Sequence, residues 1–122
     1  MILLWIAIGG ALGAMARFGI SGWVSERSSF SPLGTFVVNI SGAFALGLFA
    51  GLGDAHFTYS TEVWRLVATG VLGSYTTFST LFYETFSLIE QNAHRTALIY
   101  AVGSQVLGVL AVVLGLGSAQ LW

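Results

Sequence analysis

The sequence is poor in residues that most soluble domains and enzymes use. Its 122 residues include no cysteine, no lysine and a single proline, and only 7% are charged. The lack of cysteine excludes disulfides, thiol nucleophiles and cysteine-ligated metal sites. With 56% hydrophobic residues and a mean hydropathy of +0.86, the chain is too apolar for a soluble domain of this length. We predict an integral membrane protein, for which no nucleic-acid partner is expected.

Long uncharged stretches divide the chain into four apolar segments. They cover residues 1–16, 28–53, 66–83 and 96–122. Each is close to or longer than the roughly 20 residues that a helix needs to cross the membrane. Ala14-Met15-Ala16 resembles a signal-peptidase site, but no positive charge precedes it, so we interpret residues 1–24 as a retained first helix. The prediction is one all-α domain, residues 1–122, with four transmembrane helices.

The positive charges are nearly balanced across the predicted membrane. With four spans, Arg27 and Arg95 fall in loops on one side, Arg65 and the amino terminus fall on the other, and Arg17 lies near the end of the first helix. The bias that normally fixes orientation is therefore almost absent. A chain inserted in both orientations is predicted to assemble as an antiparallel homodimer. A weak orientation bias is the alternative.

The third apolar segment is unusually rich in hydroxyl groups. They belong to Thr69, Ser74, Tyr75, Thr76, Thr77, Ser79, Thr80 and Tyr83. Gly70, Gly73 and these Ser and Thr residues favour a helix break near residues 73–77. Broken backbone at membrane depth must be satisfied by protein, water or an ion, so the break predicts a buried or solvated site. A kink packed against neighbouring helices is the alternative.

Two polar residues in the first half of the chain have two interpretations each. Arg17 is either an interfacial anchor or a functional cation with a partner. Asn39 shares a helix face with Thr35 and Gly42, and it either joins helices or contacts a transported solute.

On the last predicted helix, Tyr100 and Ser104 form a short polar stripe. On the third predicted helix, the side chains of Phe78, Leu81 and Phe82 would ordinarily be packing residues.

Small residues recur at helical spacing in the first two helices. Gly9 and Gly13 form one small-xxx-small pair, and Gly47 and Gly51 form another. Such pairs permit close approach of helix backbones. They predict a tightly packed bundle.

The chain lacks the side chains of a catalytic centre. His56 and His94 fall in predicted loops, and no two carboxylates are placed as a buried acid and base. The polar residues at membrane depth are mostly neutral donors, which suit coordination of a small ion or solute. We therefore do not expect an enzyme.

Three blocks of residues resemble the Fluc (CrcB) family of fluoride channels, and the resemblance spans the whole chain. They are Gly9-Gly10-x-x-Gly13-Ala14-x-x-Arg17, Pro32-x-Gly34-Thr35-x-x-x-Asn39-x-x-Gly42, and Gly73-x-x-Thr76-Thr77-Phe78-Ser79-Thr80 with Glu84. The resemblance implies a passive fluoride channel of the plasma (inner) membrane that exports fluoride and lowers its toxicity. It also implies an antiparallel dual-topology homodimer with two fluoride pathways.

The resemblance also implies roles for individual residues. A structural sodium ion would be held at the dimer centre by the backbone carbonyls of Gly73 and Thr76. Arg17 and Glu84 match charged positions near the vestibules. The fluoride pathway would be lined by Asn39, Phe78, Ser79, Thr80, Leu81, Tyr100 and Ser104.

The chain departs from the family pattern at three positions. Leu81 stands where phenylalanine is common, and Gly108 and Val112 stand at later positions of the polar stripe. Two other functions compete with a channel. A proton-coupled multidrug exporter needs a membrane carboxylate, classically in its first helix, where this chain has Arg17 and no acid. A non-conducting subunit of a larger complex predicts no activity for the purified protein.

Overall fold

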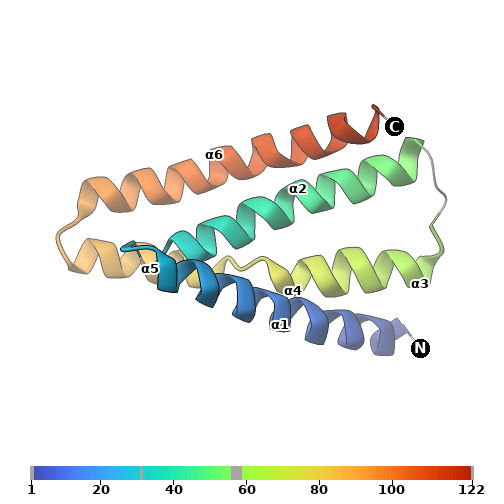
Figure 1. The fold of residues 1–122 in the computed structure, drawn as a ribbon, viewed down its shortest axis with the longest axis horizontal. Helices are drawn as coiled ribbons and strands as arrows, with labels where there is room; N and C mark the ends of the chain where they lie inside the picture. The colour runs from blue at the N-terminus through green and yellow to red at the C-terminus, as the bar shows by residue number, and fades with distance from the viewer. Residues whose placement is uncertain (1, 31, 56–58, 122) are drawn as a thin grey trace.

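The computed structural model describes residues 2–30, 32–55 and 59–121, and these residues form helices and no strand. Helices α1 and α2 are followed by a segmented helix and by α6 (Figure 1). The segmented helix contains a π-helical stretch, η1, and an interruption between α4 and α5. The elements are α1 (Ile2–Arg27), α2 (Leu33–Ala55), α3 (Thr61–Trp64), η1 (Arg65–Leu72), α4 (Gly73–Tyr75), α5 (Ser79–Glu90) and α6 (His94–Ala119).

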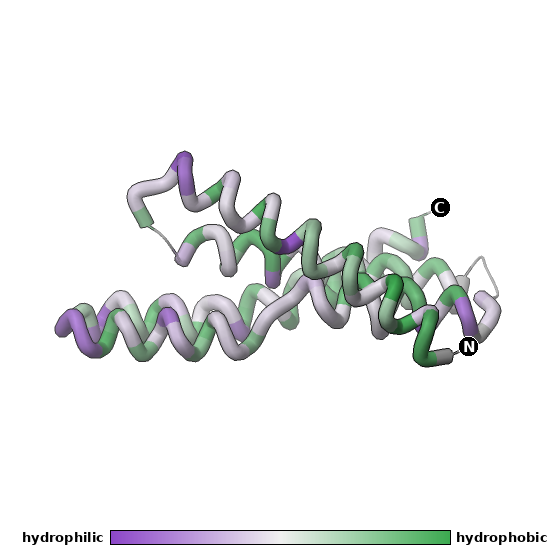
Figure 2. Tube along the Cα trace, turned by 90° about the horizontal axis from the view of Figure 1, so that it is seen from below, coloured by the Kyte–Doolittle hydropathy of each residue, from purple (hydrophilic) through white to green (hydrophobic). Residues whose placement is uncertain are grey.

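Three of these helices are long and apolar enough to cross a membrane. They cover Leu3–Arg27, Leu33–Gly53 and His94–Ala119. Apolar residues occupy most of their length, and hydrophilic residues gather at the turn between α5 and α6 and at the end of α1 (Figure 2). The predicted all-helical membrane architecture is confirmed at this level.

Glycines set how closely the helices approach. Helix α2 packs along α6, and α1 packs along η1 (Figure 1). In the first contact, a Cβ atom on Gly47 would meet the backbone of Val112. In the second, a Cβ on Gly9 would meet the backbone of Leu66 and Gly70. The small residues predicted to permit close packing therefore lie where two backbones touch.

The connection between α5 and α6 is a tight turn. Asn92 adopts a left-handed conformation with φ of 63°, and the N–H of Ala93 donates to the Leu88 carbonyl at 2.9 Å. Asn tolerates this conformation and commonly ends a helix in this way. Helix α6 then starts at His94, so the prediction that His94 lies in a loop is wrong; His56 lies outside the described residues.

A small core joins the two helices on either side of this turn. Leu81, Leu88, Ala97 and Tyr100 form a buried cluster, with Phe30, Phe36 and Ala93 packed against it. The ring of Tyr100 meets that of Phe30 edge to face at 5.9 Å. These contacts fix the start of α6 beside α5.

Candidate functional site

The segmented helix is interrupted at residues 76–78. Thr76 is extended, with φ of −79° and ψ of 154°, and α5 begins two residues after Thr77. The predicted break is therefore present. Gly73 itself remains helical, with φ of −63° and ψ of −36°, so the interruption begins at Thr76 rather than at a glycine.

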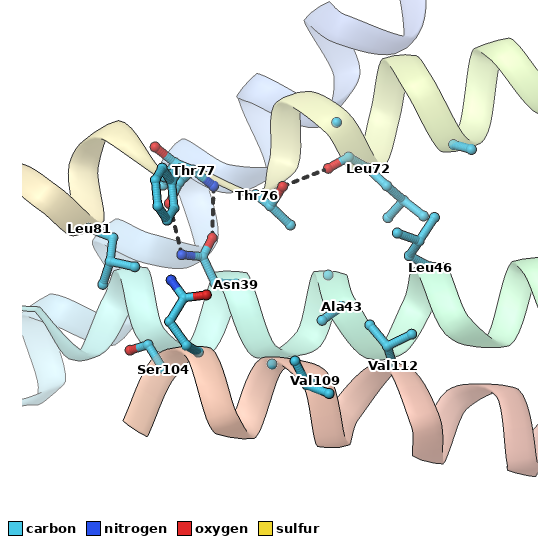
Figure 3. A pocket seen from close by; sticks show the side chains of 16 residues that line it. Asn39, Ala43, Leu46, Leu72, Thr76, Thr77, Leu81, Ser104, Val109 and Val112 are labelled. Carbon is cyan, nitrogen blue, oxygen red and sulfur yellow. Dashed lines mark hydrogen bonds between the residues drawn. The ribbon is translucent and has the colours of Figure 1, made fainter. Parts of the chain in front are cut away.

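Asn39 of α2 holds the interrupted backbone through both ends of its amide group. Its Nδ2 donates to the Thr77 carbonyl at 2.8 Å, and its Oδ1 accepts from the Thr77 N–H at 2.7 Å. Both bonds are visible in Figure 3. They replace hydrogen bonds that the helix would otherwise supply, so Asn39 is a polar link between α2 and the break, as one of its two interpretations predicted.

The same interruption removes helical partners from two backbone carbonyls. In a continuous helix, the N–H groups of Thr77 and Thr80 would donate to the carbonyls of Gly73 and Thr76. Here the Thr77 N–H donates to Asn39, and the Thr80 N–H donates to the Thr77 Oγ1 at 3.3 Å. The carbonyls of Gly73 and Thr76 thus lose these donors.

Most hydroxyl groups around the break bond to nearby groups of their own segment. Ser74 Oγ donates to the Gly70 carbonyl at 2.8 Å, and Thr76 Oγ1 donates to the Leu72 carbonyl at 3.2 Å. Thr77 Oγ1 donates to Thr80 Oγ1 at 3.0 Å. Ser and Thr side chains thus bond within their own segment, and the Thr77 hydroxyl also accepts from the Thr80 N–H that the break frees.

A cavity of about 380 Å³ lies between the break, α2 and α6, and we call it the break cavity. Leu72, Leu46 and Val112 make its apolar end, whereas Asn39 and Ser104 lie toward its polar end (Figure 3). Its polar side chains are those of Asn39, Thr76, Thr77, Ser104 and Gln105. Neutral donors and backbone therefore face this space.

A second cavity, of about 590 Å³, lies between α1 and the other side of the break, and we call it the Arg17 cavity. Arg17 and Glu26 line it together with Thr35, Thr77 and Thr80. Arg17 is half-buried and makes no ion pair with another residue that the structure describes. Thr77 lines both cavities, so the segment held by Asn39 separates them.

The structure also brings together two predicted site residues from different helices. Tyr100 donates its hydroxyl proton to Glu84 Oε1 at 3.0 Å and also lies 3.3 Å from the Pro32 carbonyl. The sequence placed Glu84 and Tyr100 in separate parts of the site. One turn further along α6, the Ser104 hydroxyl is buried without a hydrogen-bond partner among the described residues.

The remaining predicted pathway residues divide between cavity and core. Phe78 lines the break cavity, is 58% exposed in the single chain, and meets the ring of Phe82 edge to face at 4.4 Å. Leu81 lines the same cavity but is only 5% exposed because it also belongs to the core cluster. Leu81 is therefore buried, whereas Phe78 and Phe82 are exposed in the single chain. Ser79 is exposed and lines neither cavity.

Two features of the site were not predicted from sequence. One is the π-helical stretch η1, which is separated from the break only by α4. The other is Gln105, which lines the break cavity beside Ser104. A glutamine within an otherwise apolar helix is the signal that could have identified it.

A family model described as CrcB-like protein, Camphor Resistance (CrcB), matches residues 4–116 of the chain. This chain belongs to the CrcB family. A protein of Acidobacterium capsulatum named fluoride-specific ion channel FluC is 46% identical over 118 residues, which cover 95% of this chain and 94% of that protein. A protein of the same name from Chloroflexus aurantiacus is 42% identical, with 94% and 92% coverage. A third, from a Roseiflexus species, is 38% identical, with 98% coverage of both.

The family and the apolar helices together establish an integral membrane protein. The family described in the sequence analysis is confirmed, and with it the expectation that the chain is not an enzyme, because these relatives are named as ion channels. The roles of single residues, the sodium ion and the dimer stay predictions.

Proposed function

We propose that this protein is a passive, fluoride-selective channel that exports fluoride across the plasma (inner) membrane. The observation that carries the proposal is the polar break between two cavities, with Thr77 lining both. Its relatives' names give the ion. Hydrogen fluoride crosses lipid and ionises at neutral pH, so fluoride accumulates inside a cell. A passive channel lets the anion leave and lowers its toxicity.

The neutral donors around the break suit a small, strongly hydrated anion. A selective passage must replace the ion's water with several donors yet release the ion again. Asn39 has a second N–H beyond its two bonds to Thr77, the Ser104 hydroxyl has no partner among the described residues, and Phe78 offers a positively polarised ring edge. We assign the pathway to these residues with Thr80 and Tyr100, and Leu81 contributes through the cavity wall; Ser79 lines neither cavity of the single chain.

Two charged residues lie near this polar passage. Arg17 lines the cavity on the α1 side together with Glu26, makes no ion pair with another described residue, and attracts anions toward Thr77 and Thr80. Glu84 accepts a hydrogen bond from Tyr100 on α6. We assign both to vestibules: Arg17 gathers the anion, and Glu84 orients the Tyr100 hydroxyl.

We propose that residues 61–90, the third helical segment in chain order, form a membrane span in addition to the three long helices. The beginning of α1 and the end of α6 lie at the same end of the molecule (Figure 1), as an even number of crossings requires. The segmented helix runs the length of the bundle between them. Its interruption explains why it does not form one long helix, and the Asn39 bonds satisfy the freed backbone at that depth.

We further propose that two chains in opposite orientations form a dimer around a sodium ion. The near balance of Arg residues supports insertion in both orientations. The carbonyls of Gly73 and Thr76 lack the donors of Thr77 and Thr80, and carbonyls at unwound helix segments are typical sodium ligands. Gly73 is exposed, so a second chain can approach it.

The direct test of function is anion release from liposomes. Purified protein is reconstituted in vesicles loaded with fluoride or chloride, a potassium ionophore removes the opposing membrane potential, and released anion is recorded with ion-selective electrodes. We expect rapid fluoride release and chloride release close to that of protein-free vesicles. Equal release of both anions, or proton-coupled uptake of organic cations, would overturn the proposal.

The test of assembly fixes the orientation of the chain. Lys residues added to the loops beside Arg27 and Arg95, or beside Arg65, bias insertion in opposite directions. Each biased variant should be inactive alone, and the two expressed together should recover fluoride release. Activity of one variant by itself contradicts the antiparallel dimer.

A further inference from the structure

Gln105 is a polar side chain of the break cavity that has no role in the site described so far. It lies on α6 directly after Ser104 and faces the same cavity as Phe78 and Asn39. Its amide makes no hydrogen bond with the residues that the structure describes. Helix α6 is apolar enough to cross a membrane, and an unpaired amide is costly at that depth. Gln105 is exposed in the single chain and lines the cavity, so an ion in the cavity can reach its amide.

The other polar side chains of this cavity are largely engaged. Asn39 uses both ends of its amide on Thr77, and the hydroxyl of Thr76 donates to the Leu72 carbonyl. The Ser104 hydroxyl differs from these groups because it has no hydrogen-bond partner among the described residues, although Ser104 is only 7% exposed. Two consecutive residues of α6 thus bring uncommitted hydrogen-bond donors to one cavity.

On the α6 side of the cavity, the lining residues after Gln105 have no side-chain donor. Gly108, Val109 and Val112 follow along the same helix, and all three line the cavity. An anion that leaves Ser104 along α6 would therefore meet only apolar surface. Gln105 is the nearest side chain on this helix that can hold the anion, because its long stem carries two N–H donors.

We propose that Gln105 is a further fluoride-contacting residue, whose amide N–H takes over the anion from Ser104 where the helix lacks other donors. The inference rests on the proposed channel function. The amide is neutral, so it binds the ion without trapping it as a fixed positive charge would. It also favours the anion with the highest charge density, because such an anion accepts the strongest hydrogen bonds.

The test removes the donor while keeping the shape of the side chain. Gln105→Met has nearly the same length and no N–H, so fluoride release from liposomes should fall by about tenfold, the effect of losing one hydrogen bond to a charged group. The matched control is Val106→Met, because Val106 is exposed and lines neither cavity. It should release fluoride at the unmodified rate.

A second variant moves the amide instead of deleting it. The exchange Gln105→Val with Val106→Gln keeps the composition of α6 and turns the amide about 100° around the helix, away from the cavity. It should be as slow as Gln105→Met. Size-exclusion chromatography and thermal unfolding are recorded for every variant, and Gln105→Leu replaces Gln105→Met if the latter does not fold.

The outcomes separate this inference from the proposed function. If the unmodified, folded protein releases no fluoride, the channel function is wrong and the inference falls with it. If the unmodified protein conducts and a folded Gln105→Met conducts equally well, the function stands and Gln105 does not contact the ion. If Gln105→Met changes the assembly state but not the release per assembled protein, the amide is a packing contact and the inference is again overturned.

Discussion

The helix contacts and the helix break use small and polar residues in opposite ways. Along the contact of α2 with α6, Gly47 and Gly115 lie against backbone atoms, and neither has room for a Cβ atom. At the break, a Cβ on Gly73 would meet nothing closer than the Ala68 carbonyl at 3.7 Å. The glycine contacts are filled within one chain, whereas at the break the carbonyls of Gly73 and Thr76 lose their helical donors.

The chain's fold and its proposed function therefore depend on different residues. Substitutions of the glycines at the helix contacts should prevent the chain from folding. Changes at the break should leave a folded chain that conducts poorly. A substitution at a glycine contact should therefore affect folding, and a substitution at the break should affect fluoride release from a folded protein.

The largest effect is expected for Gly115→Val. A Cβ there would collide with the Phe44 carbonyl and come 2.7 Å from the Leu48 nitrogen, which are backbone atoms that cannot move aside. Overpacking of this kind typically costs about 1–3 kcal/mol and sometimes more. We expect loss of the monodisperse peak in size-exclusion chromatography and a lower unfolding temperature.

The matched control is Gly117→Val, two residues further along α6. A Cβ on Gly117 has no neighbour within 4 Å, so this variant should behave as the unmodified protein does. Equal behaviour of the Gly115 and Gly117 variants would show that α2 and α6 do not pack as closely as described.

The next largest effect is expected for Asn39→Asp, which acts on the break through its link to α2. The carboxylate cannot donate to the Thr77 carbonyl, and it places negative charge beside the anion's path, where screening is weak. Fluoride release should fall by more than about tenfold, since one unsatisfied buried group alone costs about 1–3 kcal/mol. Fluoride release from liposomes measures the effect on conduction, and thermal unfolding measures the effect on stability.

Asn39→Ala separates the two contributions of this residue. It removes the bonds to the Thr77 N–H and carbonyl without adding charge. It should lower stability as much as Asn39→Asp and impair fluoride release less. If alanine and aspartate reduce release equally, the charge has no effect and Asn39 acts only by holding the break.

The position of the break was predictable from sequence, but its cause was not. The crowding of hydroxyl groups at residues 74–80 indicates competition for backbone bonds, and that is a local signal. The partner that fixes the extended Thr76–Thr77 segment is Asn39, 38 residues away, and only the tertiary fold brings it there. For the same reason, the sequence alone could not pair Tyr100 with Glu84, which lie 16 residues apart on two helices.

The predicted glycine pairs illustrate the same limit. Gly9 and Gly13 were expected to permit close packing, and both face η1. Gly73 looks similar in sequence but is open in the chain, because its environment depends on where the neighbouring helices pass. Leu81 likewise lies at a family pathway position, yet the α5–α6 turn brings it into the core. The local sequence pattern therefore predicts the helices and their interruption, whereas the tertiary structure determines which atoms each residue contacts.

A smaller effect is expected for Phe78→Leu. Phe78 is 58% exposed in the single chain, so an apolar change of similar volume should cost the fold less than about 1.5 kcal/mol. Fluoride release should nevertheless fall several-fold, because no aliphatic side chain offers a polarised ring edge. Release rates and the assembly state are measured on the same preparation.

Phe86→Leu provides the matched control for the ring. Phe86 is 60% exposed, lies on α5, the helix that follows Phe78, and lines neither cavity. Its variant should conduct normally. A stable Phe78→Leu protein that releases fluoride at the unmodified rate would return Phe78 to a packing role and remove the ring from the proposed pathway.

The smallest effect on the chain itself is expected for Gly73→Ala. Gly73 is helical and exposed and has open space where a Cβ would stand, so alanine should leave the fold intact and even favour the helix by about 1 kcal/mol or less. A defect can then arise only outside the chain, at the proposed contact with a partner and sodium. We expect unchanged helix content by circular dichroism, a lower dimer fraction in size-exclusion chromatography, and fluoride release that needs more sodium. An unchanged dimer fraction with unchanged sodium dependence would place the Gly73 carbonyl outside any ion site, because the added methyl group lies on the residue that carries it.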